Sequence, residues 1–369
     1  MKLQRVSGLI GWLQYQDGHS LAGNTRPLAQ WFERFDCLLA STALLHPYLR
    51  RTPHQSWIVR HQQRTVGIIT AMLCRDGSGR FGFFNCVSDA TVAHMLTDAA
   101  EQWLRSQGAK AIMGPFNPSI HESCGLLKEA KGVLPYGYPD TSSHLISCLE
   151  ACGYSIAKTL YAFQQADRQG AIRFEKRMGP LLESLAKHGM KMIVPGWRTI
   201  SRDAQWLECL INQCWQQNWG FEPISRAETL QMLLRILVFL PAGSLCFIGR
   251  NGQPAGLSLA VPDAREIAGQ LPSWLGPLNL PGLLVQLRRG KTQTWRIALL
   301  GVTPDLQGTM LGLAASCKML QYQIHSNAER SSRVADMGWI LEDNQPMLRF
   351  LQLYGGELAT THVIMAKEL

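Results

Sequence analysis

Apolar residues recur along this chain in short alternating runs and in short helical stripes. Residues 56–73 and 244–261 each predict a strand, a tight polar turn and a second strand. In the second segment Asn251 and Gly252 stand at the turn, and both residue types tolerate positive φ. The pattern therefore predicts two β-hairpins of the same kind.

Two short amphipathic helices are predicted after the hairpins. Residues 145–154 and 347–356 carry apolar side chains three or four positions apart. Gly153 and Gly355 can take the left-handed conformation that ends such a helix. Hairpin and helix thus occur twice in the same order, which indicates an internal repeat.

Further elements complete each half of the repeat. In the first half, residues 89–108 predict a helix with Asp89 as its N-cap and Gly108 as its stop, and residues 110–113 predict a strand. In the second half, residues 295–302 predict a strand, and a helix is predicted from about residue 308. Two more strands are predicted at 333–341 and 361–369.

The polar residues 164–179 mark the predicted domain boundary. We therefore predict two domains, residues 1–165 and 166–369, which agrees with the usual size of roughly 150–200 residues per domain. Each is expected to be an α/β domain of the mixed-sheet, α+β kind, with helices on the faces of its sheet.

The composition is that of a folded protein, with 46% hydrophobic and 17% charged residues. The most apolar stretch, residues 233–249, is interrupted by Arg235, Pro241 and Gly243, so we predict neither a membrane span nor a membrane partner. The first residues lack a secretory signal, which favours the cytoplasm. Ten cysteines are too sparse for a disulfide framework and are expected to be reduced core residues, without a metal site.

The net charge of +9 favours an anionic partner such as a nucleotide cofactor, RNA or an acidic surface. The alternative is that the basic residues only keep the protein soluble. Charge alone does not decide between these partners.

A loop suited to phosphate follows the strand that ends at Val302. Residues 303–312 lead into an apolar helix, and backbone N–H groups at a helix start bind phosphate oxygens. Gly308, Thr309 and Gly312 are small enough for a ligand to approach the backbone closely. The pattern predicts an anion site at this loop.

The same loop resembles the acyl-CoA loop of the GCN5-related N-acetyltransferase (GNAT) superfamily. That loop reads Gln/Arg-x-x-Gly-x-Gly/Ala; Gln307 and Gly312 match its ends, and Met310 replaces its middle glycine. Asn344 and the Gly355-Gly356 pair match the ends of a downstream helix of the family. Longer segments resemble bacterial tandem-GNAT proteins: 81–89, 114–127, 212–225, 257–263, 299–308 and 339–356.

The resemblance implies an acyl-CoA donor, acetyl-CoA or a longer acyl-CoA, bound by the second half. The free backbone groups near Leu300 and Val302 would pair with the pantetheine arm as an added strand does. The pyrophosphate would face the loop residues Gln307, Gly308, Thr309, Met310, Leu311 and Gly312, with Asn344 at the nearby helix start. The alternative is a loop that has lost or changed its donor.

Acyl transfer to an amine needs a base for the amine and an acid for the leaving thiolate. The strand 295–302 holds no carboxylate, so Asp336 on the next strand is the candidate base, and Glu342 is second. The family's acid is a tyrosine at the position of Leu351, and Tyr354 lies most of a turn away. A structural Asp336 and a packing role for Tyr354 are the competing interpretations, and His362 is another titratable group.

The expected acceptor is an amine or a peptide. Four residues are candidates for binding it: Asn117, Tyr138, Trp219 and Asp263. A buried aromatic cluster around Trp219 is the competing interpretation. The first half lacks a Gly-rich phosphate loop, so it is predicted to be a degenerate copy that binds acceptor or supports the second half.

Residues 273–291 form a predicted amphipathic insertion with a basic end, suited to a lid or a partner surface. Pro277 and Pro281 argue against an interfacial membrane helix there.

Three functions remain open from the sequence. The first is a GNAT acyltransferase that moves an acyl group from acyl-CoA to an amine. The second is an aminoacyltransferase that uses aminoacyl-tRNA, which the charge of +9 and the altered loop favour. The third is a non-catalytic binding protein with a decayed donor site. The acyl group, the acceptor and the oligomeric state stay open.

Overall fold

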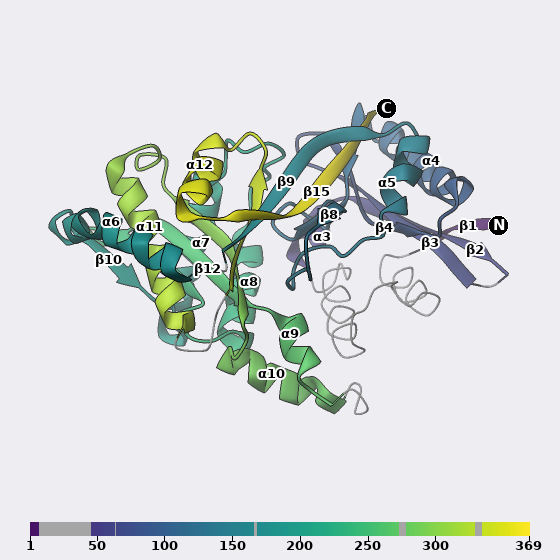
Figure 1. The fold of residues 1–369 in the computed structure, drawn as a ribbon. Coiled ribbons are helices and arrows are strands. Elements are labelled where there is room, and N and C mark those ends of the chain that lie inside the picture. The colour runs from purple at the N-terminus through teal and green to yellow at the C-terminus, as the bar shows by residue number, and fades with distance from the viewer. Residues whose placement is uncertain (7–45, 63, 166–167, 273–277, 329–333) are drawn as a thin grey trace. The chain divides into compact units, whose positions relative to one another are not determined.

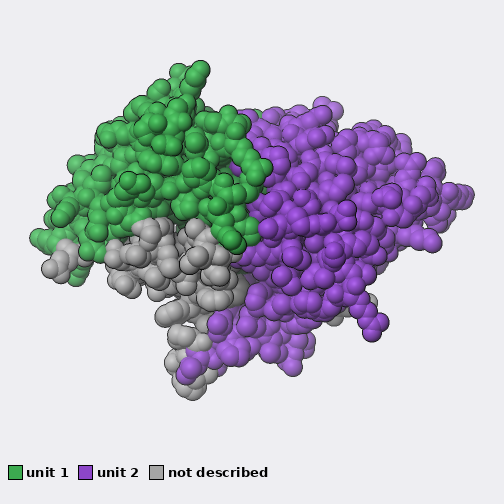
Figure 2. Space-filling view, turned by 180° about the vertical axis from the view of Figure 1, so that it is seen from behind, with its two compact units in different colours: residues 1–25, 30–160, 360–369 green, residues 26–29, 161–359 purple. Residues whose placement is uncertain are grey.

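A computed structural model describes residues 1–6, 46–62, 64–165, 168–272, 278–328 and 334–369. The chain forms two compact units (Figure 2). Unit 1 holds the described residues up to 160 together with 360–369, and unit 2 holds those from 161 to 359. The last strand therefore begins in unit 2 and ends in unit 1.

Unit 1 is built on a mixed sheet with the strand order β1-β2-β3-β4-β5-β15, and β8 also pairs with β15. Among the described residues β4 pairs in parallel with β5, and the pairs β1–β2, β2–β3, β3–β4, β5–β15 and β8–β15 are antiparallel. The strands are β1 (Lys2–Val6), β2 (His54–His61), β3 (Arg64–Leu73), β4 (Gly79–Cys86), β5 (Ala111–Gly114), β8 (Leu126–Ala130) and β15 (Glu357–Glu368). A separate hairpin joins β6 (Phe116–Asn117) to β7 (Ser123–Cys124), and the helices are α3 (Pro47–Arg51), α4 (Ala90–Ser106) and α5 (His144–Ala151).

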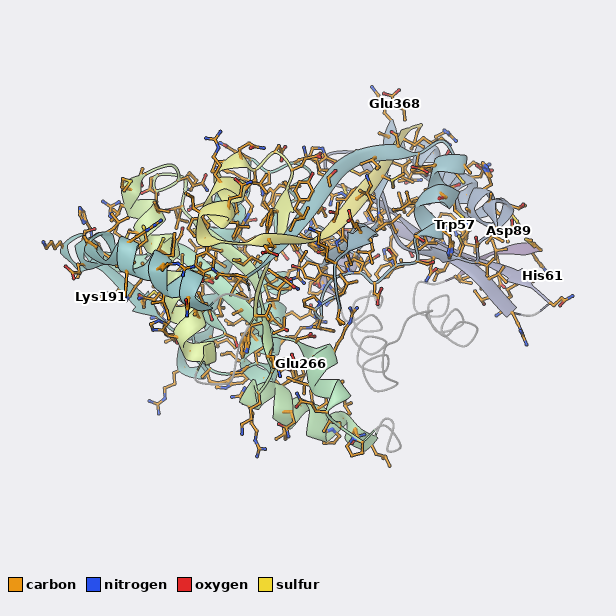
Figure 3. All side chains as sticks on the ribbon, viewed as in Figure 1. Trp57, His61, Asp89, Lys191, Glu266 and Glu368 are labelled. Atoms are coloured by element: carbon orange, nitrogen blue, oxygen red, sulfur yellow. The ribbon has the colours of Figure 1, made fainter. Side chains whose placement is uncertain are left out.

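Helix α4 supplies much of the core of unit 1. Asp89, labelled in Figure 3, accepts a hydrogen bond from the backbone of Thr91 and caps the helix as predicted. Leu96 and other apolar residues of the same helical face are fully buried. A Cβ on Gly67 of β3 would lie 2.8 Å from Leu96 Cδ1, so glycine lets helix and sheet approach closely.

Unit 2 has the strand order β9-β14-β13-β12-β11-β10. Its strands are β9 (Ser155–Gln165), of which residues 155–160 belong to unit 1, β10 (Met190–Ile193), β11 (Leu245–Arg250), β12 (Gln253–Pro262), β13 (Thr294–Val302) and β14 (Val334–Leu341). Its helices are α6 (Arg168–Lys187), α7 (Ile200–Cys214), α8 (Arg226–Phe239), α9 (Ala264–Gly269), α10 (Leu280–Arg289), α11 (Met310–Ala328) and α12 (Gln345–Tyr354) (Figure 1).

Alternate residues of β11 show how the sheet of unit 2 divides two cores. Leu245 and Phe247 pack with α7 and α8, whereas Cys246 and Ile248 pack with α11 and with the end of α6. Successive strand residues point to opposite faces, so one strand serves both cores. Unit 2 is therefore a three-layer domain of helices, sheet and helices, and the predicted mixed α/β class is confirmed.

The locally encoded elements match the sequence predictions. Asn251 and Gly252 have φ values of 52° and 81° in the β11–β12 turn, as the hairpin signal requires. Gly153 and Gly355 take φ values of 84° and 81° just after α5 and α12. The polar stretch 164–179 is not a simple linker, because α6 begins at Arg168.

None of the described helices has both the length and the apolar composition needed to cross a membrane.

Candidate functional site

The edge of β13 opens where the strand parts from β14. On one side β13 pairs with β12 as far as Val302. On the other side it pairs in parallel with β14 only over residues 294–297, although it continues to Val302. Peptide groups of residues 298–302 that face away from β12 thus have no strand partner within the described part of the chain. An extended ligand can add to such an edge as a strand does.

A bulge in the β12–β13 pairing accompanies this opening. The register shifts between Leu259 and Ala260, which pair with Leu299 and Ile297. Ala298 is the extra residue, and a bulge of this kind bends and twists a strand. Ala298, Leu299 and Leu300 are half-buried and pack against the cores of unit 2 from the side of the open edge.

The loop after β13 is held by its own hydrogen bonds. The hydroxyl of Thr309 donates to Leu306 O at 2.7 Å and accepts from Gly312 N at 3.0 Å, so Thr309 is the N-cap of α11. The side-chain amide of Gln307 donates to Cys214 O and Val302 O, both at 3.1 Å. These two side chains, predicted to face the ligand, stabilise the loop itself.

Three backbone amides of the loop remain available. Gln307 N, Thr309 N and Gly312 N have partners inside the loop. Gly308 N, Met310 N and Leu311 N have no hydrogen-bond partner among the described residues. They lie at the start of the 19-residue helix α11, whose dipole favours an anion at this end.

Met310 does not fill the space in front of these amides. Its side chain is 65% exposed, and Gly308 also lies on the surface. Gly312 is buried, and the packing of the loop requires glycine there, because a Cβ would lie 1.9 Å from Leu306 O. Gly308 and Met310 are therefore both accessible from solvent in spite of the missing middle glycine, and an anion site at this loop stays a prediction.

The end of α7 borders this loop and the open strand. Besides the bond from Gln307 to Cys214, a Cβ on Gly301 would lie 2.9 Å from the ring of Trp215. Burial raises the pKa of the Cys214 thiol to about 12, so this sulfur stays protonated at neutral pH and is a poor nucleophile. The sequence analysis did not single out Asn212, whose side chain exchanges two hydrogen bonds with the backbone of Ile224 and fixes the segment after α7.

Asp336 lies beside the point where the two strands part. It is fully buried, pairs in register with Arg296 of β13, and accepts a hydrogen bond from the side chain of Gln164 at 3.1 Å. Arg296 itself is buried, with its guanidinium over the ring of Trp339. Asp336 is thus an internal carboxylate with a cationic neighbour, and its role as a base stays a prediction.

Tyr354 is part of an aromatic cluster at the end of α12. Its ring centroid lies 5.1 Å from that of Phe174 and 6.3 Å from that of Phe350. The backbone carbonyl of Tyr354 accepts a hydrogen bond from the side chain of Gln165. Asn344 caps the other end of the same helix by accepting from Met347 N at 3.2 Å. These contacts give both residues structural roles, and their predicted roles toward the donor stay untested.

The acceptor candidates lie in different units. In unit 1, Asn117 Oδ1 accepts from Phe83 N at 2.6 Å, and the buried Tyr138 stacks on His362. In unit 2, Asp263 is a buried N-cap of α9 that accepts from Arg265 N. Trp219 is half-buried in the segment between α7 and α8. Their binding roles stay predictions.

Glu122, in the segment 114–127 of unit 1, belongs to a polar pair that the sequence did not suggest. His46 Nε2 lies 3.2 Å from a carboxylate oxygen of Glu122, and His46 is almost fully buried. The residues are 76 positions apart, so no local pattern could have joined them. Among the described residues no group of three or more His, Cys, Asp or Glu side chains could hold a metal ion.

Solved structures share this arrangement over the whole chain. A tandem GNAT protein from the clavulanic acid biosynthesis pathway is 14% identical and matches 100% of this chain and 98% of its own, with a TM-score of 0.53. The GCN5-related glucosamine N-acetyltransferase region of a fungal multi-domain GH3 β-N-acetylglucosaminidase is 13% identical, with a TM-score of 0.55 over 99% of this chain and 38% of that one. This chain has the tandem GNAT fold.

Two curated proteins are similar to this chain in sequence. Protein YghO of Escherichia coli (strain K12) is 27% identical over 329 residues, which cover 85% of this chain and 82% of YghO. Bacterial ceramide synthase of Caulobacter vibrioides (strain NA1000 / CB15N) is 27% identical over 354 residues, 92% of this chain and 89% of that protein. No family model matches the chain.

Proposed function

We propose that this tandem GNAT protein is an N-acyltransferase that takes acyl-CoA as donor and an amine as acceptor. The observation that carries the proposal is the set of free amides of Gly308, Met310 and Leu311 next to the open edge of β13. The amides suit the pyrophosphate of CoA, and the strand edge suits the amides of its pantetheine arm. The similarity to a bacterial ceramide synthase supports an amine acceptor.

The reaction joins the amine nitrogen to the thioester carbonyl carbon and breaks the carbon–sulfur bond. The amine must first lose its proton to a base, and the leaving CoA thiolate takes up a proton. We propose Asp336 as the base because it lies one residue before the last register pair of β13 and β14. Residues 298–302 would supply backbone N–H groups to the pantetheine and to the thioester carbonyl.

The similarity to a bacterial ceramide synthase points to a class of acceptor. A ceramide is an N-acylated long-chain amino alcohol, so a long-chain amino alcohol is the first acceptor to test, beside water-soluble amines. The half-buried segment after α7, with Trp215 and Trp219, is the surface of unit 2 that we propose for this acceptor, because it borders the open strand.

Replacing Met310 tests the donor site at one backbone atom. Met310 is the first residue of α11, where proline fits a helix but removes the N–H. Met310→Pro is expected to weaken CoA binding about tenfold or more, because a hydrogen bond to a charged group contributes about 1.5–3 kcal/mol. Calorimetric titration with CoA and acetyl-CoA measures the change.

The matched control is Met310→Ala, which removes the thioether and keeps the amide. It is expected to bind CoA like the parent protein, because the methionine side chain points to solvent. Equal CoA affinities of the proline and alanine variants would refute the anion site. If aminoacyl-tRNA stabilised the protein against unfolding and no acyl-CoA did, aminoacyl-tRNA would replace acyl-CoA as the proposed donor.

A further inference from the structure

Helix α8 exposes a row of large apolar side chains. Leu230, Leu234 and Val238 stand four residues apart, so they lie on one side of the helix, and each is 37–45% exposed. The other side of α8 buries Leu233 and Ile236 in the core of unit 2. Single exposed apolar residues are ordinary on protein surfaces, but a continuous row marks a contact surface.

Helix α10 extends this row. One guanidinium nitrogen of Arg288 donates to Val238 O at 3.1 Å and to Leu240 O at 3.3 Å, which places the end of α10 against the end of α8. Val285 lies one turn before Arg288 and is half exposed. Figure 1 shows α8, α9 and α10 at the same end of unit 2.

The charges around the row are positive. Arg289 and Lys291 at the end of α10 are exposed. Glu228 is the one acidic residue of α8 and α10 together, and it is buried in the capping box with Ser225. Glu266 of α9, labelled in Figure 3, accepts hydrogen bonds from Thr292, Gln293 and Thr294. The nearby carboxylates are therefore engaged within the protein, and the exposed cations give the surface its charge.

Of the two prolines that argued against an interfacial helix here, Pro277 lies outside the described residues and Pro281 proves compatible with a helix. Pro281 occupies the first turn of α10, where proline is compatible with the helix. The helix then runs without interruption to Arg289 and ends at Gly290, whose φ of 63° is left-handed.

We propose that this face binds the surface of an anionic phospholipid bilayer; we call it the α8–α10 face and define it by Leu230, Leu234, Val238, Val285, Arg289 and Lys291. An apolar row beside Lys and Arg is the pattern of a surface that lies in the lipid headgroup region, without spanning the bilayer. A second copy of this chain fits the face less well, because two-fold contact would bring like charges together. The inference goes beyond the proposed acyl transfer and does not depend on it.

Vesicle co-sedimentation tests the proposal with the full chain. Vesicles of phosphatidylglycerol and phosphatidylethanolamine are expected to bind the protein in low salt, and neutral phosphatidylcholine vesicles to bind it far less. Because each basic residue near an anionic surface contributes about a fivefold gain in binding, Arg289→Gln with Lys291→Gln should lower vesicle affinity roughly 20- to 30-fold. The same two changes at the exposed Lys176 and Arg177 of α6 are the matched control and should leave affinity unchanged.

A second pair of variants tests the apolar row. Leu234→Asp is expected to abolish vesicle binding, whereas Leu353→Asp, on the exposed side of α12, should not. Absence of binding to anionic vesicles, or equal losses in both members of either pair, would overturn the proposal. The proposal would also be overturned if light scattering showed that the parent protein is a dimer and that the Leu234→Asp variant is a monomer.

The two proposals fail separately. Acyl transfer to a water-soluble amine, without vesicles, should be the same in Leu234→Asp as in the parent protein. A protein that binds vesicles and transfers no acyl group would refute only the enzyme, and the reverse result would refute only the membrane surface.

Discussion

At the residue scale, two glycines of the loop between β13 and α11 are required for different reasons. A Cβ on Gly312 would lie 1.9 Å from Leu306 O, the carbonyl that receives the Thr309 hydroxyl. Gly308 has a φ of 72° but open space around its Cβ position. Gly312→Ala should therefore displace the loop and weaken CoA binding more than tenfold. Gly308→Ala should mainly lower the free energy of unfolding, by about 1 kcal/mol.

Urea unfolding and CoA titration of both variants check this difference. If Gly312→Ala kept full CoA affinity, the close approach to Leu306 would not control the loop's shape.

Asp336 supports a second prediction at this scale. Asp336→Asn keeps the size of the side chain and its position beside Arg296 but removes the proposed base. We expect kcat to fall about 100-fold or more while CoA affinity changes little. The exposed Asp343→Asn is the control and should be neutral. A variant that lost stability but kept the parent pH–rate profile would make Asp336 a positioning residue.

The same residues show how far sequence reasoning reaches. The loop could be located because a strand, small residues and an apolar helix follow one another in the chain. Which atoms of the loop would bind a ligand could not be predicted. The sequence does not show whether a small residue is required for the packing of the loop or for the close approach of the ligand. Thr309 and Gly312 hold the loop itself, and the side chain of Met310 is exposed, so that its backbone amide is the group proposed to meet the ligand.

At the element scale, the end of β15 is tied to α4 by a buried ion pair. Lys367 Nζ lies 2.9 and 3.0 Å from the carboxylate oxygens of Glu101, which also accepts from Tyr154 at 3.1 Å. Glu101 is only 2% exposed. Lys367→Met would leave this carboxylate with Arg105, 3.2 Å away, as its remaining cationic partner, so we expect a loss of about 1.5 kcal/mol in the free energy of unfolding.

Chemical denaturation followed by tryptophan fluorescence measures this loss. Glu368→Gln, at the exposed neighbouring position labelled in Figure 3, is the control and should change stability little. Equal effects of the two substitutions would show that the ion pair contributes nothing.

Elements with local signals were predicted well, and elements without them were not. Asn251-Gly252 and the glycines after α5 and α12 act within a few residues, so the sequence displays them directly. Helix α8 was missed because it is apolar on nearly every side, so it shows no stripe of period 3.6. The predicted boundary 164–179 falls on the start of helix α6 because the first residues of that helix are polar.

At the scale of the whole chain, a single cut in the sequence does not separate two complete units. Unit 1 includes residues 360–369, which pair with both β5 and β8. Val363, Ile364 and Met365 of this segment are fully buried. The internal repeat predicts two consecutive domains. The sequence does not show that a strand at the end of the chain completes the first sheet, because no local pattern links the two.

This topology makes a prediction about truncation. A chain that ends at Ala359 lacks the strand that joins β5 to β8 in unit 1. Trp57 and Trp103, whose ring centroids are 6.4 Å apart in the core of unit 1, should become solvent-exposed, and trypsin should cleave within residues 46–160. Unit 2 retains its sheet and should resist cleavage. A synthetic peptide of residues 357–369 should restore protection, because it supplies the missing backbone partners. A fragment of residues 1–165 that unfolded cooperatively with both tryptophans buried would contradict the need for this strand.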